Sequence, residues 1–480
     1  MYEEEKIELI KSQQKDPVMM ALFLLEEHPY ITRCAGQLYI FNGKCYDLLD
    51  VKDMDKVFLE FVVKYGVTQT WKNINYIIRA LWAYPTIKEV EEMNQYEDLI
   101  CLNNCVLNIK TREVFDHDPK YYFDSFVDVD YDKNAHNCEN FTNYLDTTFS
   151  GDHDTINNVV RLGGYLLDTS CAAEKMFLFD GKGSNGKSLL LNIFSMFFAK
   201  DQVTPLSLEQ LASTGFNKEI LIRSRVNLSA EQKKGFLDAE EIKKIISGDL
   251  ISIDRKYKLT ISFNPKTKIL ANCNGAPTFK DNSHAIYRRM LMISFRNCYM
   301  DEYEYNQVKD PEKKHVYLKD KHLLTKIKEE KSAILNMFID GLLELRADNY
   351  NFIAGDSLLN TMAEFKRDSD TVREFLEDNY ELSTEGETTT LREIYDHYRL
   401  WYKQNVSYSD SSLKFRINEM GKRVKDIMDI ESVGQKPVFN SVSQRMERET
   451  MYPIRPIKDL DIPIEEVMTV EQATQRNLNF

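Results

Sequence analysis

Residues 175–190 read KMFLFDGKGSNGKSLL, and this stretch decides the fold. An apolar run at 176–179 is long enough for a buried strand, and a second apolar run at 189–198 is typical of a helix. Between them, GKGSNGKS matches the pattern G-x-x-x-x-G-K-[ST] of a phosphate-binding loop, in the strand–loop–helix order that such a loop needs. The alternative is a chance match, expected about once in a hundred chains of this length from average residue frequencies.

The loop predicts a nucleoside triphosphate site. Glycines reach backbone angles closed to other residues and leave no Cβ in the way of a phosphate. Loop N–H groups and the positive end of the following helix attract oxygen anions. Lys187 would reach the β- and γ-phosphates, and the Ser188 hydroxyl would bind Mg²⁺. The predicted cofactors are therefore ATP and Mg²⁺, and the predicted binding residues are Gly181, Lys182, Gly183, Ser184, Asn185, Gly186, Lys187 and Ser188.

Length and composition predict a soluble, multidomain globular protein. A chain of 480 residues exceeds one core, so two to four domains are expected. No apolar run approaches the roughly 18–20 residues of a membrane span. The first residues, MYEEEKIELIK, are too polar for a signal peptide, so we expect a cytoplasmic protein, in a bacterial host. Cys101 and Cys105 form a CxxxC with no second pair at metal spacing, which favours reduced thiols over zinc.

The formal net charge of −14 limits how the protein could contact nucleic acid. Its bulk would repel phosphate, so positive charge must be concentrated in patches or a channel. This argues against simple coating of DNA and is compatible with an enzyme that grips a strand at a few points.

The first 170 residues predict a mixed α and β region. Helices are expected at 6–12, 18–27, 51–64 and 71–82, a hairpin at 37–46, two short strands within 99–116, and two helices within 138–170, with Gly163-Gly164 as a bend between apolar segments. Asp128 and Asp130 form a D-x-D that a two-metal site could use, but no second carboxylate cluster accompanies them. We therefore favour a solvated strand end.

Residues 175–298 alternate short β-like runs with helices, which predicts a parallel α/β core. The apolar strand at 221–228 ends just before Glu231. In phosphate-loop ATPases the corresponding strand delivers an acidic residue to Mg²⁺ and the attacking water, so Glu231 is the candidate, and an ordinary exposed glutamate is the alternative.

A β-hairpin with a basic tip is expected at 251–263. The tip carries Arg255, Lys256, Tyr257 and Lys258, a combination that can pair with phosphate and stack on a base. A solvated hairpin tip without function is an equal alternative on these residues alone.

Polar residues at the ends of the next strands are candidates for hydrolysis. The strand that begins at Lys268 leads to Asn274, whose amide could orient a water. Arg288 and Arg289 precede a buried strand, and an arginine near the γ-phosphate stabilises transition-state charge. The charged stretch 301–330 is expected to be a surface excursion, and 332–346 an amphipathic helix.

The pattern changes from residue 371. Helices are expected at 371–379, 391–404 and 413–427, followed by a strand at 438–440 and a polar tail at 456–480. This order fits a helix-turn-helix or winged-helix module, although an ordinary solvated helix face is at least as good an interpretation. The basic face would comprise Lys414, Arg416, Lys422, Arg423 and Lys425.

The order of these elements over residues 95–430 resembles the superfamily 3 helicases, in the subgroup of phage, plasmid and poxvirus primase–helicases. Residues 100–132 look like the domain before the helicase there, which supports a structural role for Asp128 and Asp130. The Walker A motif would be 181–188 and the Walker B strand 225–231. Residues 247–258 look like the family's small-residue turn and DNA-binding hairpin. The resemblance makes Asn274, rather than Asn272, the sensor, and Arg289 or Arg288 the arginine finger.

The chain departs from the family pattern at Walker B, where paired acids are common. Here Glu231 is followed by Gln232, Lys233 and Lys234, so one carboxylate would have to serve both Mg²⁺ and water. The roughly 95 residues before the match are too few for a primase domain, so we expect a helicase without its own priming activity.

The resemblance implies an α/β AAA+ core with a parallel sheet, at 136–345, between an N-terminal α+β domain, 1–135, and a small helical, winged-helix-like C-terminal domain, 346–480. It also implies a homo-oligomeric ring, a hexamer in this family, with ATP between subunits and the arginine supplied by the neighbour. Hydrolysis would move the hairpin along one DNA strand, usually 3′ to 5′. Single-stranded and origin DNA are then the expected partners, with a separate primase or loader and no membrane.

Two other functions remain open on the sequence. One is an origin-binding initiator that reads DNA with residues 371–430 and uses the ATPase as an assembly switch. The other is an AAA+ ATPase that remodels protein and never contacts DNA.

Overall fold

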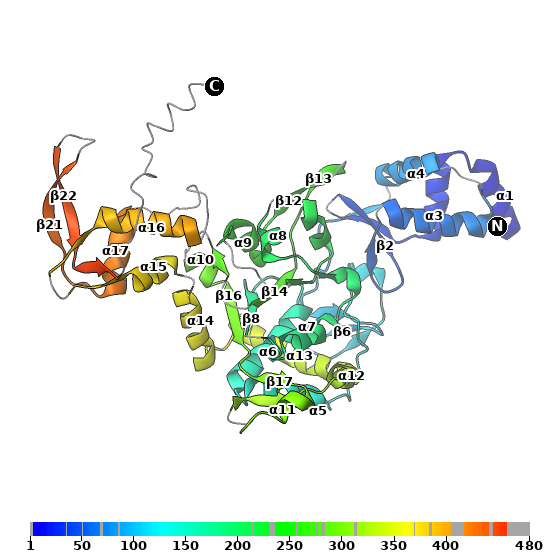
Figure 1. Ribbon diagram of the computed structural model, residues 1–480. Helices are drawn as coiled ribbons and strands as arrows, with labels where there is room; N and C mark the ends of the chain where they lie inside the picture. Colours follow the sequence, from blue (N-terminus) through cyan, green and yellow to red (C-terminus); the bar gives the residue numbers. More distant parts are fainter. Residues whose placement is uncertain are drawn as a thin grey trace. The chain divides into compact units, whose positions relative to one another are not determined.

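The computed structural model describes residues 3–457 apart from 35, 50, 68–70, 85–86, 182, 214–215, 230–235, 256–257, 274–276, 280–283, 312–313, 369, 384–385, 406–416 and 441–444. The chain divides into two compact units (Figure 1). The first comprises residues 1–279 and 283–364, and the second comprises residues 280–282 and 365–480.

The first unit begins with helices packed around a small mixed sheet. The helices are α1 (Glu3–Gln13), α2 (Pro17–Glu27), α3 (Val51–Tyr65) and α4 (Trp71–Ala83). The strands are β1 (Ile31–Cys34), β2 (Gln37–Phe41), β3 (Tyr46–Leu48) and β4 (Lys88–Val90). Their order is β3-β2-β1-β4, with β4 parallel to β1. Helix α2 starts where local chemistry dictates, because the Asp16 carboxylate accepts the N–H of Val18 and Pro17 occupies the first turn. The predicted helices and the hairpin are confirmed.

A three-stranded antiparallel sheet follows, made of β5 (Leu99–Cys101), β6 (Val106–Asn108) and β7 (Val114–Phe115). The sequence predicts two strands here, but the structure has three, because the chain makes one more turn than expected. The chain reverses at 102–105 as well as at the predicted turn near Lys110. The earlier turn lacks the glycine or proline by which a sequence usually marks one.

The centre of the first unit is a five-stranded parallel sheet in the order β16-β8-β14-β10-β9. Its strands are β8 (Met176–Asp180), β9 (Val203–Thr204), β10 (Val226–Ser229), β14 (Lys268–Cys273) and β16 (Met290–Ser294). All residues of 176–179 are buried. The predicted parallel α/β core is therefore confirmed, and the carboxyl ends of these strands meet at one edge, as in other open parallel sheets.

Helices α6 (His153–Leu167) and α13 (Lys331–Ala347) pack closely against each other beside this sheet (Figure 1). Two helices are present within 138–170 as predicted, but Gly163 and Gly164 lie inside α6, so the predicted bend between apolar segments is wrong. A Cβ on Gly164 would come within 2.6 Å of the backbone nitrogen of Leu342. Both glycines therefore serve close helix packing, a role that looks the same as a bend in sequence.

The remaining elements of the first unit surround the sheet. The helices and 3-10 turns are η1 (Pro119–Tyr121), α5 (Glu139–Phe149), α7 (Lys187–Ser195), η2 (Lys200–Gln202), α8 (Leu208–Ala212), η3 (Phe216–Ile222), α9 (Ala239–Ser247), α10 (His284–Tyr287), α11 (Glu302–Tyr305) and α12 (Leu323–Glu329). The strands are β11 (Phe236–Leu237), β12 (Ile251–Arg255), β13 (Lys258–Phe263), β15 (Thr278–Phe279), β17 (Cys298–Met300) and β18 (Val316–Leu318). Helix α14 (Asp356–Asp368) begins in the first unit and ends in the second.

The second unit combines helices with short antiparallel sheets. The helices are α15 (Thr371–Asn379), α16 (Leu391–Asn405) and α17 (Ile417–Met428). The strands are β19 (Tyr380–Leu382), β20 (Thr389–Thr390), β21 (Gly434–Asn440), β22 (Arg445–Tyr452) and β23 (Ile454–Pro456). The predicted helices are present, and the predicted tail strand is part of β21, which pairs with β22. Aromatic packing holds the unit together, because Phe375 contacts the rings of Tyr380, Tyr398 and Trp401.

No helix among the described residues is long and apolar enough to cross a membrane.

Candidate nucleotide site

The glycine-rich loop connects the end of β8 to the start of α7. Strand β8 ends at Asp180, and α7 begins at Lys187. At Gly186 the backbone is left-handed, with φ of 93°, which favours glycine. A Cβ on Gly181 would come within 2.5 Å of the Phe295 carbonyl oxygen. Glycine is therefore required at both positions for steric reasons. Lys182 lies outside the described residues.

Asn185 holds the loop in place from within. Its amide nitrogen donates to the Phe295 carbonyl at 3.3 Å, and its amide oxygen accepts the Lys187 backbone N–H at 3.4 Å. The side chain is buried. Gly183 and Ser184, which precede Asn185 in the loop, are exposed.

Lys187 connects the loop to the neighbouring strand of the sheet. Its ammonium donates to the carbonyl oxygen of Cys273 at 3.2 Å and to that of Gly181. The adjacent Ser188 is exposed at the first turn of α7. Lys187 and Ser188 therefore lie side by side at the start of α7, where the loop ends.

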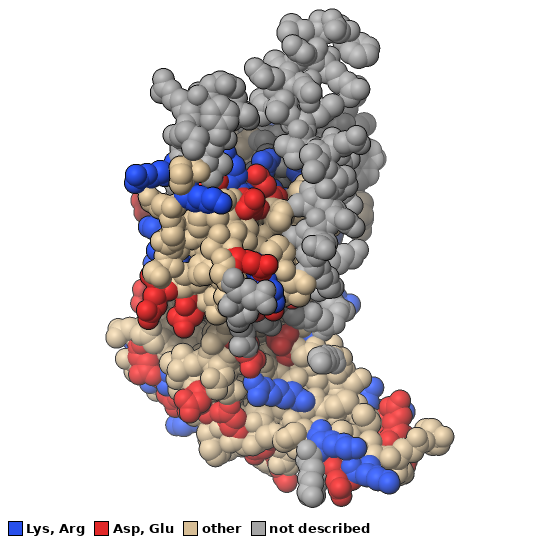
Figure 2. Space-filling model, turned by 60° about the vertical axis from the view of Figure 1, so that its left-hand side comes forward, with Lys and Arg blue, Asp and Glu red and all other residues tan. Residues whose placement is uncertain are grey.

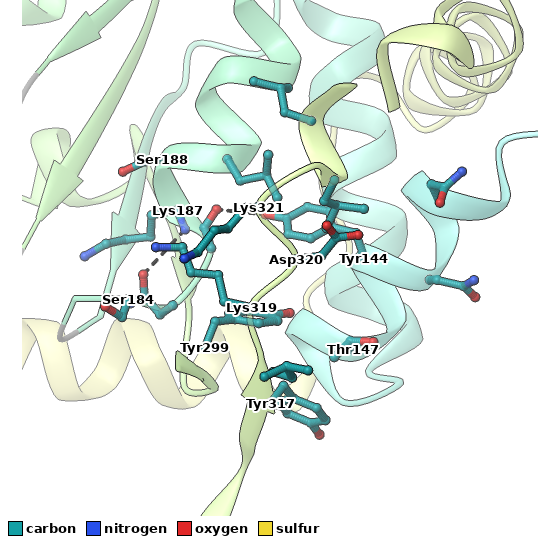
Figure 3. Close-up of a pocket in the computed structure, with 18 of the residues that line it drawn as sticks. Tyr144, Thr147, Ser184, Lys187, Ser188, Tyr299, Tyr317, Lys319, Asp320 and Lys321 are labelled. Atoms are coloured by element: carbon teal, nitrogen blue, oxygen red, sulfur yellow. Dashed lines mark hydrogen bonds between the residues drawn. The ribbon is translucent and has the colours of Figure 1, made fainter. Parts of the chain in front are cut away.

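A pocket of about 680 Å³ opens beside this loop (Figure 3). That volume is in the range of small-ligand sites. The pocket is lined by loop residues 183–189, by the α5 side chains Asn140, Asn143, Tyr144 and Thr147, by Asn272 and Tyr299, and by residues 317–321, 323 and 324. The last group lies in the stretch expected to be a surface excursion, and residues 318–322 are indeed exposed, but most of this group also lines the pocket.

Two tyrosines fix the pocket to the loop. The Tyr144 hydroxyl donates to the Gly186 carbonyl at 2.9 Å, and burial raises the pKa of Tyr144 far above its usual value, so the hydroxyl stays a donor. The Tyr299 backbone N–H donates to the Ser184 carbonyl at 2.6 Å, and its hydroxyl lies 2.8 Å from the Thr148 hydroxyl. The sequence offered no signal for either tyrosine, because both lie far from the loop in the chain.

The strand ends that follow the loop lie at the same edge of the sheet. Cys273 is opposite Asp180, and Ser229 is opposite Ala271. Glu231 and Asn274 lie outside the described residues, and each follows one of these strand ends within two positions. A buried amide network steadies β10, since the Asn227 side chain accepts the Leu206 N–H and donates to the Leu206 carbonyl.

Asn272 lies in the pocket, in addition to the predicted Asn274. Its amide oxygen is buried and has no hydrogen-bond partner among the described residues. Such an orphaned acceptor is uncommon in folded proteins, and a water or ligand usually satisfies it.

The two candidate arginines differ in their surroundings. The Arg289 guanidinium lies 3.0 Å from the Glu174 carboxylate and 3.1 Å from the Ser247 hydroxyl, and 13% of its side chain is exposed. Arg288 is exposed. Neither arginine lines the described part of the pocket. Arg289 is therefore engaged within its own chain, whereas Arg288 is exposed to solvent.

The predicted hairpin is confirmed in the backbone. Strands β12 and β13 pair antiparallel from Ile251 opposite Phe263 to Arg255 opposite Lys258. The tip residues Lys256 and Tyr257, and the side chains of Arg255 and Lys258, lie outside the described part. Their contacts with DNA stay a prediction.

The acidic pair near residue 130 has structural contacts. The Asp128 carboxylate accepts the Asn103 amide at 2.9 Å and lies 3.6 Å from the Lys331 ammonium. The Asp130 carbonyl accepts the Ser332 hydroxyl at 2.8 Å. Both residues thus tie the small sheet region to the start of α13, which favours the structural interpretation.

Charge on the described surface is mixed. On the face shown in Figure 2, acidic and basic side chains are interspersed over the described parts. In the second unit, Arg423 of the predicted basic face pairs with Asp370, while Lys422 and Lys425 are present on α17. Lys414 and Arg416 lie outside the described residues.

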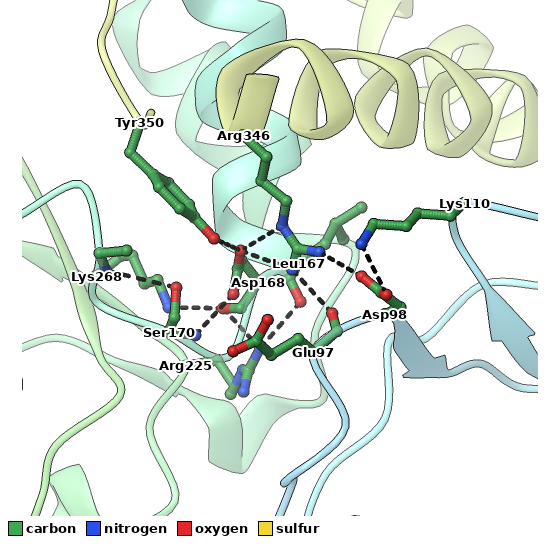
Figure 4. Close-up of polar contacts among 11 residues, drawn as sticks. Glu97, Asp98, Lys110, Leu167, Asp168, Ser170, Arg225, Lys268, Arg346 and Tyr350 are labelled. Atoms are coloured by element: carbon green, nitrogen blue, oxygen red, sulfur yellow. Dashed lines mark hydrogen bonds and ion pairs between the residues drawn. The ribbon is translucent and has the colours of Figure 1, made fainter. Parts of the chain in front are cut away.

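A buried polar cluster holds the other edge of the sheet (Figure 4). The Asp168 carboxylate accepts the Arg346 guanidinium at 2.9 Å and the Tyr350 hydroxyl at 3.0 Å. The Asp168 carbonyl accepts Lys268 at 2.6 Å and Arg225 at 3.1 Å. Burial lowers the pKa of Lys268 to about 8. Helices α6 and α13 are thereby joined to the starts of β10 and β14.

Comparisons with known proteins cover separate parts of the chain. The family described as "D5 N terminal like" matches residues 30–150, and the one described as "Family of unknown function (DUF5906)" matches residues 179–289. A protein of Acanthamoeba polyphaga mimivirus named "Putative helicase L207/L206" is 21% identical in an alignment of 318 residues that covers 58% of this chain. The chain spans 32% of that relative.

Among solved structures, the C-terminal region of NrS-1 in its A form covers 92% of this chain at 12% identity, with a TM-score of 0.48 and all of its own chain aligned. A further apo structure of the same region has a TM-score of 0.47 at 12% identity, with the same coverage of both chains.

Proposed function

We propose that this chain is a protein of the phage and viral primase–helicase type and that it acts as an ATP-dependent DNA helicase of a virus or mobile element. The similarity to a putative helicase and to the D5 N-terminal family supports a helicase- or primase-type replication protein. The observation that carries the proposal of ATP-dependent unwinding is the loop at 181–188, which faces a pocket of about 680 Å³ that Lys187 and Ser188 help to line.

Nucleotide binding would change the contacts of Lys187. Its ammonium is bonded to the carbonyls of Gly181 and Cys273, and a γ-phosphate would compete with both because it carries full negative charge. Loss of the hydrogen bond to the Cys273 carbonyl would free the end of β14, which directly precedes Asn274. The chain thus has a direct connection between phosphate binding and the residue proposed to orient the attacking water.

The remaining roles are assigned as follows. Ser188 and Glu231 would hold Mg²⁺, which supplies charge neutralisation at the phosphates. Glu231 would also serve as the general base that accepts a proton from the attacking water. An arginine from a neighbouring subunit would stabilise the transition state in a homo-oligomeric ring. The hairpin of β12 and β13 would contact single-stranded DNA with Arg255, Lys256, Tyr257 and Lys258, and carry it 3′ to 5′.

Strand displacement tests the proposal. The full-length protein, with ATP and Mg²⁺, is expected to unwind a DNA duplex that has a single-stranded 3′ tail and to leave a duplex with a 5′ tail intact. Lys187→Ala should abolish both unwinding and ATP hydrolysis, whereas Lys200→Ala, at an exposed lysine outside the pocket, should retain them. Hydrolysis by the wild type without displacement of either substrate would rule out a helicase.

A further inference from the structure

The pocket has a second wall opposite the glycine-rich loop, made by residues 317–324. This segment reads YLKDKHLL and runs from β18 into the first turn of α12. It is fixed at one point by the Lys319 backbone N–H, which donates to the Met300 carbonyl at 2.9 Å. Strand β18 also pairs in parallel with β17, and β17 contains Tyr299. The wall is therefore anchored to the same residue that contacts the loop through Ser184.

The wall offers apolar surface to the pocket. Leu318 is 53% exposed, although it lines a concave site. Leu323 and Leu324 lie beside it and are only partly buried. A large apolar side chain left accessible inside a pocket is typical of a surface that a ligand covers.

The charged side chains of this wall point in different directions. Asp320 is turned to Lys326, 2.7 Å away on α12. Figure 3 shows the side chains of Lys319 and Lys321 extending toward the side of the pocket where Ser184 and Lys187 lie. Lys321 has a distant partner in Asp301 at 3.7 Å, and 71% of its side chain is exposed. Two cations therefore face the proposed phosphate position while the intervening carboxylate is paired elsewhere.

The α5 side of the pocket supplies polar groups. Tyr144 is committed to the Gly186 carbonyl, and Asn140 donates its amide to Glu330 at 2.6 Å. Asn143 is exposed on the same helix and lines the pocket. A carboxamide at this place can read the edge of a base, as asparagine does with adenine.

We propose that residues 317–324 are the second wall of a nucleoside triphosphate site. Leu318, Leu323 and Leu324 would pack against the base. Lys319 and Lys321 would contact the phosphates of the nucleotide that is bound by the loop of the same subunit. The inference rests on the proposed nucleotide binding by the loop at 181–188. It adds a base-binding surface and two phosphate ligands from a distant part of the chain.

Calorimetric titration of the full-length protein with two probes tests each half of this wall. The probes are ATP with Mg²⁺ and inorganic tripolyphosphate, which lacks a base. The double variant Lys319→Gln/Lys321→Gln should bind both probes about tenfold more weakly, because two cations near the phosphates are lost. Leu318→Ser should weaken ATP binding about threefold and leave tripolyphosphate unchanged.

A matched control has the same net charge as the double variant Lys319→Gln/Lys321→Gln. Lys314→Gln/Lys328→Gln removes two exposed lysines near the same segment but outside the pocket lining, and it should bind both probes as the wild type does. An affinity unchanged in Lys319→Gln/Lys321→Gln, together with loss of binding in Lys187→Ala, would overturn the lysine assignment and leave the loop intact. Equal weakening of both probes by Leu318→Ser would overturn the base assignment. No binding of either probe by the wild type would overturn the loop proposal itself.

Discussion

The ammonium nitrogen of Lys187 lies 3.2 Å from the carbonyl oxygen of Cys273, the last residue of β14. The first turn of α7 is thus bonded to the strand that leads to Asn274. This contact and the one to Gly181 satisfy a lysine that is almost wholly buried. A bound triphosphate would compete with both carbonyls for the ammonium group.

Replacing Lys187 should therefore remove the stabilisation that a triphosphate gives. For the wild type, ATP with Mg²⁺ at a hundred times its Kd is expected to raise the free energy of unfolding by about 2.7 kcal/mol. Lys187→Met should show no such increase, measured as the shift in Tm. Adenosine monophosphate, which has no β- or γ-phosphate, is the control and should act equally on both proteins. An equal ATP shift in the variant would show that Lys187 does not contact the triphosphate.

Asn272 gives a second prediction, because its buried amide oxygen lacks a partner among the described residues. Asn272→Ala should lower the rate of ATP hydrolysis about tenfold, since a polar group in the site would be lost. Asn192→Ala, at an exposed position of α7, should hydrolyse ATP normally. Comparison with Asn274→Ala then assigns the sensor. A normal rate in Asn272→Ala beside a slow one in Asn274→Ala would support the residue chosen from the sequence.

The sequence was informative where one local stretch carries the whole signal. The apolar run at 176–179 and the glycines of 181–186 predict a strand and a loop that need no distant partner to be recognised. The hairpin at 251–263 is similar, because apolar alternation on both sides of a turn is a local pattern. These elements are present, and with them the parallel sheet that orders the strand ends.

The sequence was uninformative where residues act through long-range contact. Tyr144 precedes the loop in the sequence and Tyr299 follows it, yet both contact the loop, and no spacing rule links them. Residues 317–324 look like a solvated surface because their lysines and Asp320 are charged, yet they line the pocket. Gly164 lies in a helix where a bend was expected, because its function depends on Leu342, far along the chain.

Arg288 and Arg289 should separate into a catalytic and a structural role. Arg289→Ala is expected to lower the free energy of unfolding by about 1 kcal/mol, because it leaves Glu174 and Ser247 without their partner. Glu174→Ala should lower it similarly. Arg288→Ala should leave stability unchanged and reduce ATP hydrolysis about a thousandfold.

Mixing subunits of two variants distinguishes an arginine finger supplied by a neighbouring subunit from one that acts within the same chain. Arg288→Ala retains Lys187, and Lys187→Ala retains Arg288, so an oligomer mixed from both contains complete sites at some interfaces. Equimolar mixing is therefore expected to restore part of the ATPase activity. No recovery from subunits that do co-assemble would contradict an arginine in trans at this position.

The buried carboxylate of Asp168 predicts how stability depends on pH. Burial alone would raise its pKa, but Lys268 and Arg346 outweigh this and hold the pKa below its usual value. A carboxyl group whose pKa is lower in the folded state stabilises the protein above its unfolded pKa of about 3.9. That stabilisation is lost as pH falls through the folded pKa.

Asp168→Asn should therefore be destabilised at neutral pH, by about 3 kcal/mol, because Arg346 loses a buried partner. The difference from the wild type should shrink as pH falls below the unfolded pKa of about 3.9, and it should disappear below the folded pKa, where the carboxyl group is protonated in both states. Urea unfolding at pH 7 and at successively lower pH measures both. Asp340→Asn is the matched control on α13, since its carboxylate is 68% exposed and its pair with Arg112 contributes little. A gap between wild type and Asp168→Asn that stays constant down to pH 3 would mean that the Asp168 carboxylate is not the group that couples folding to pH.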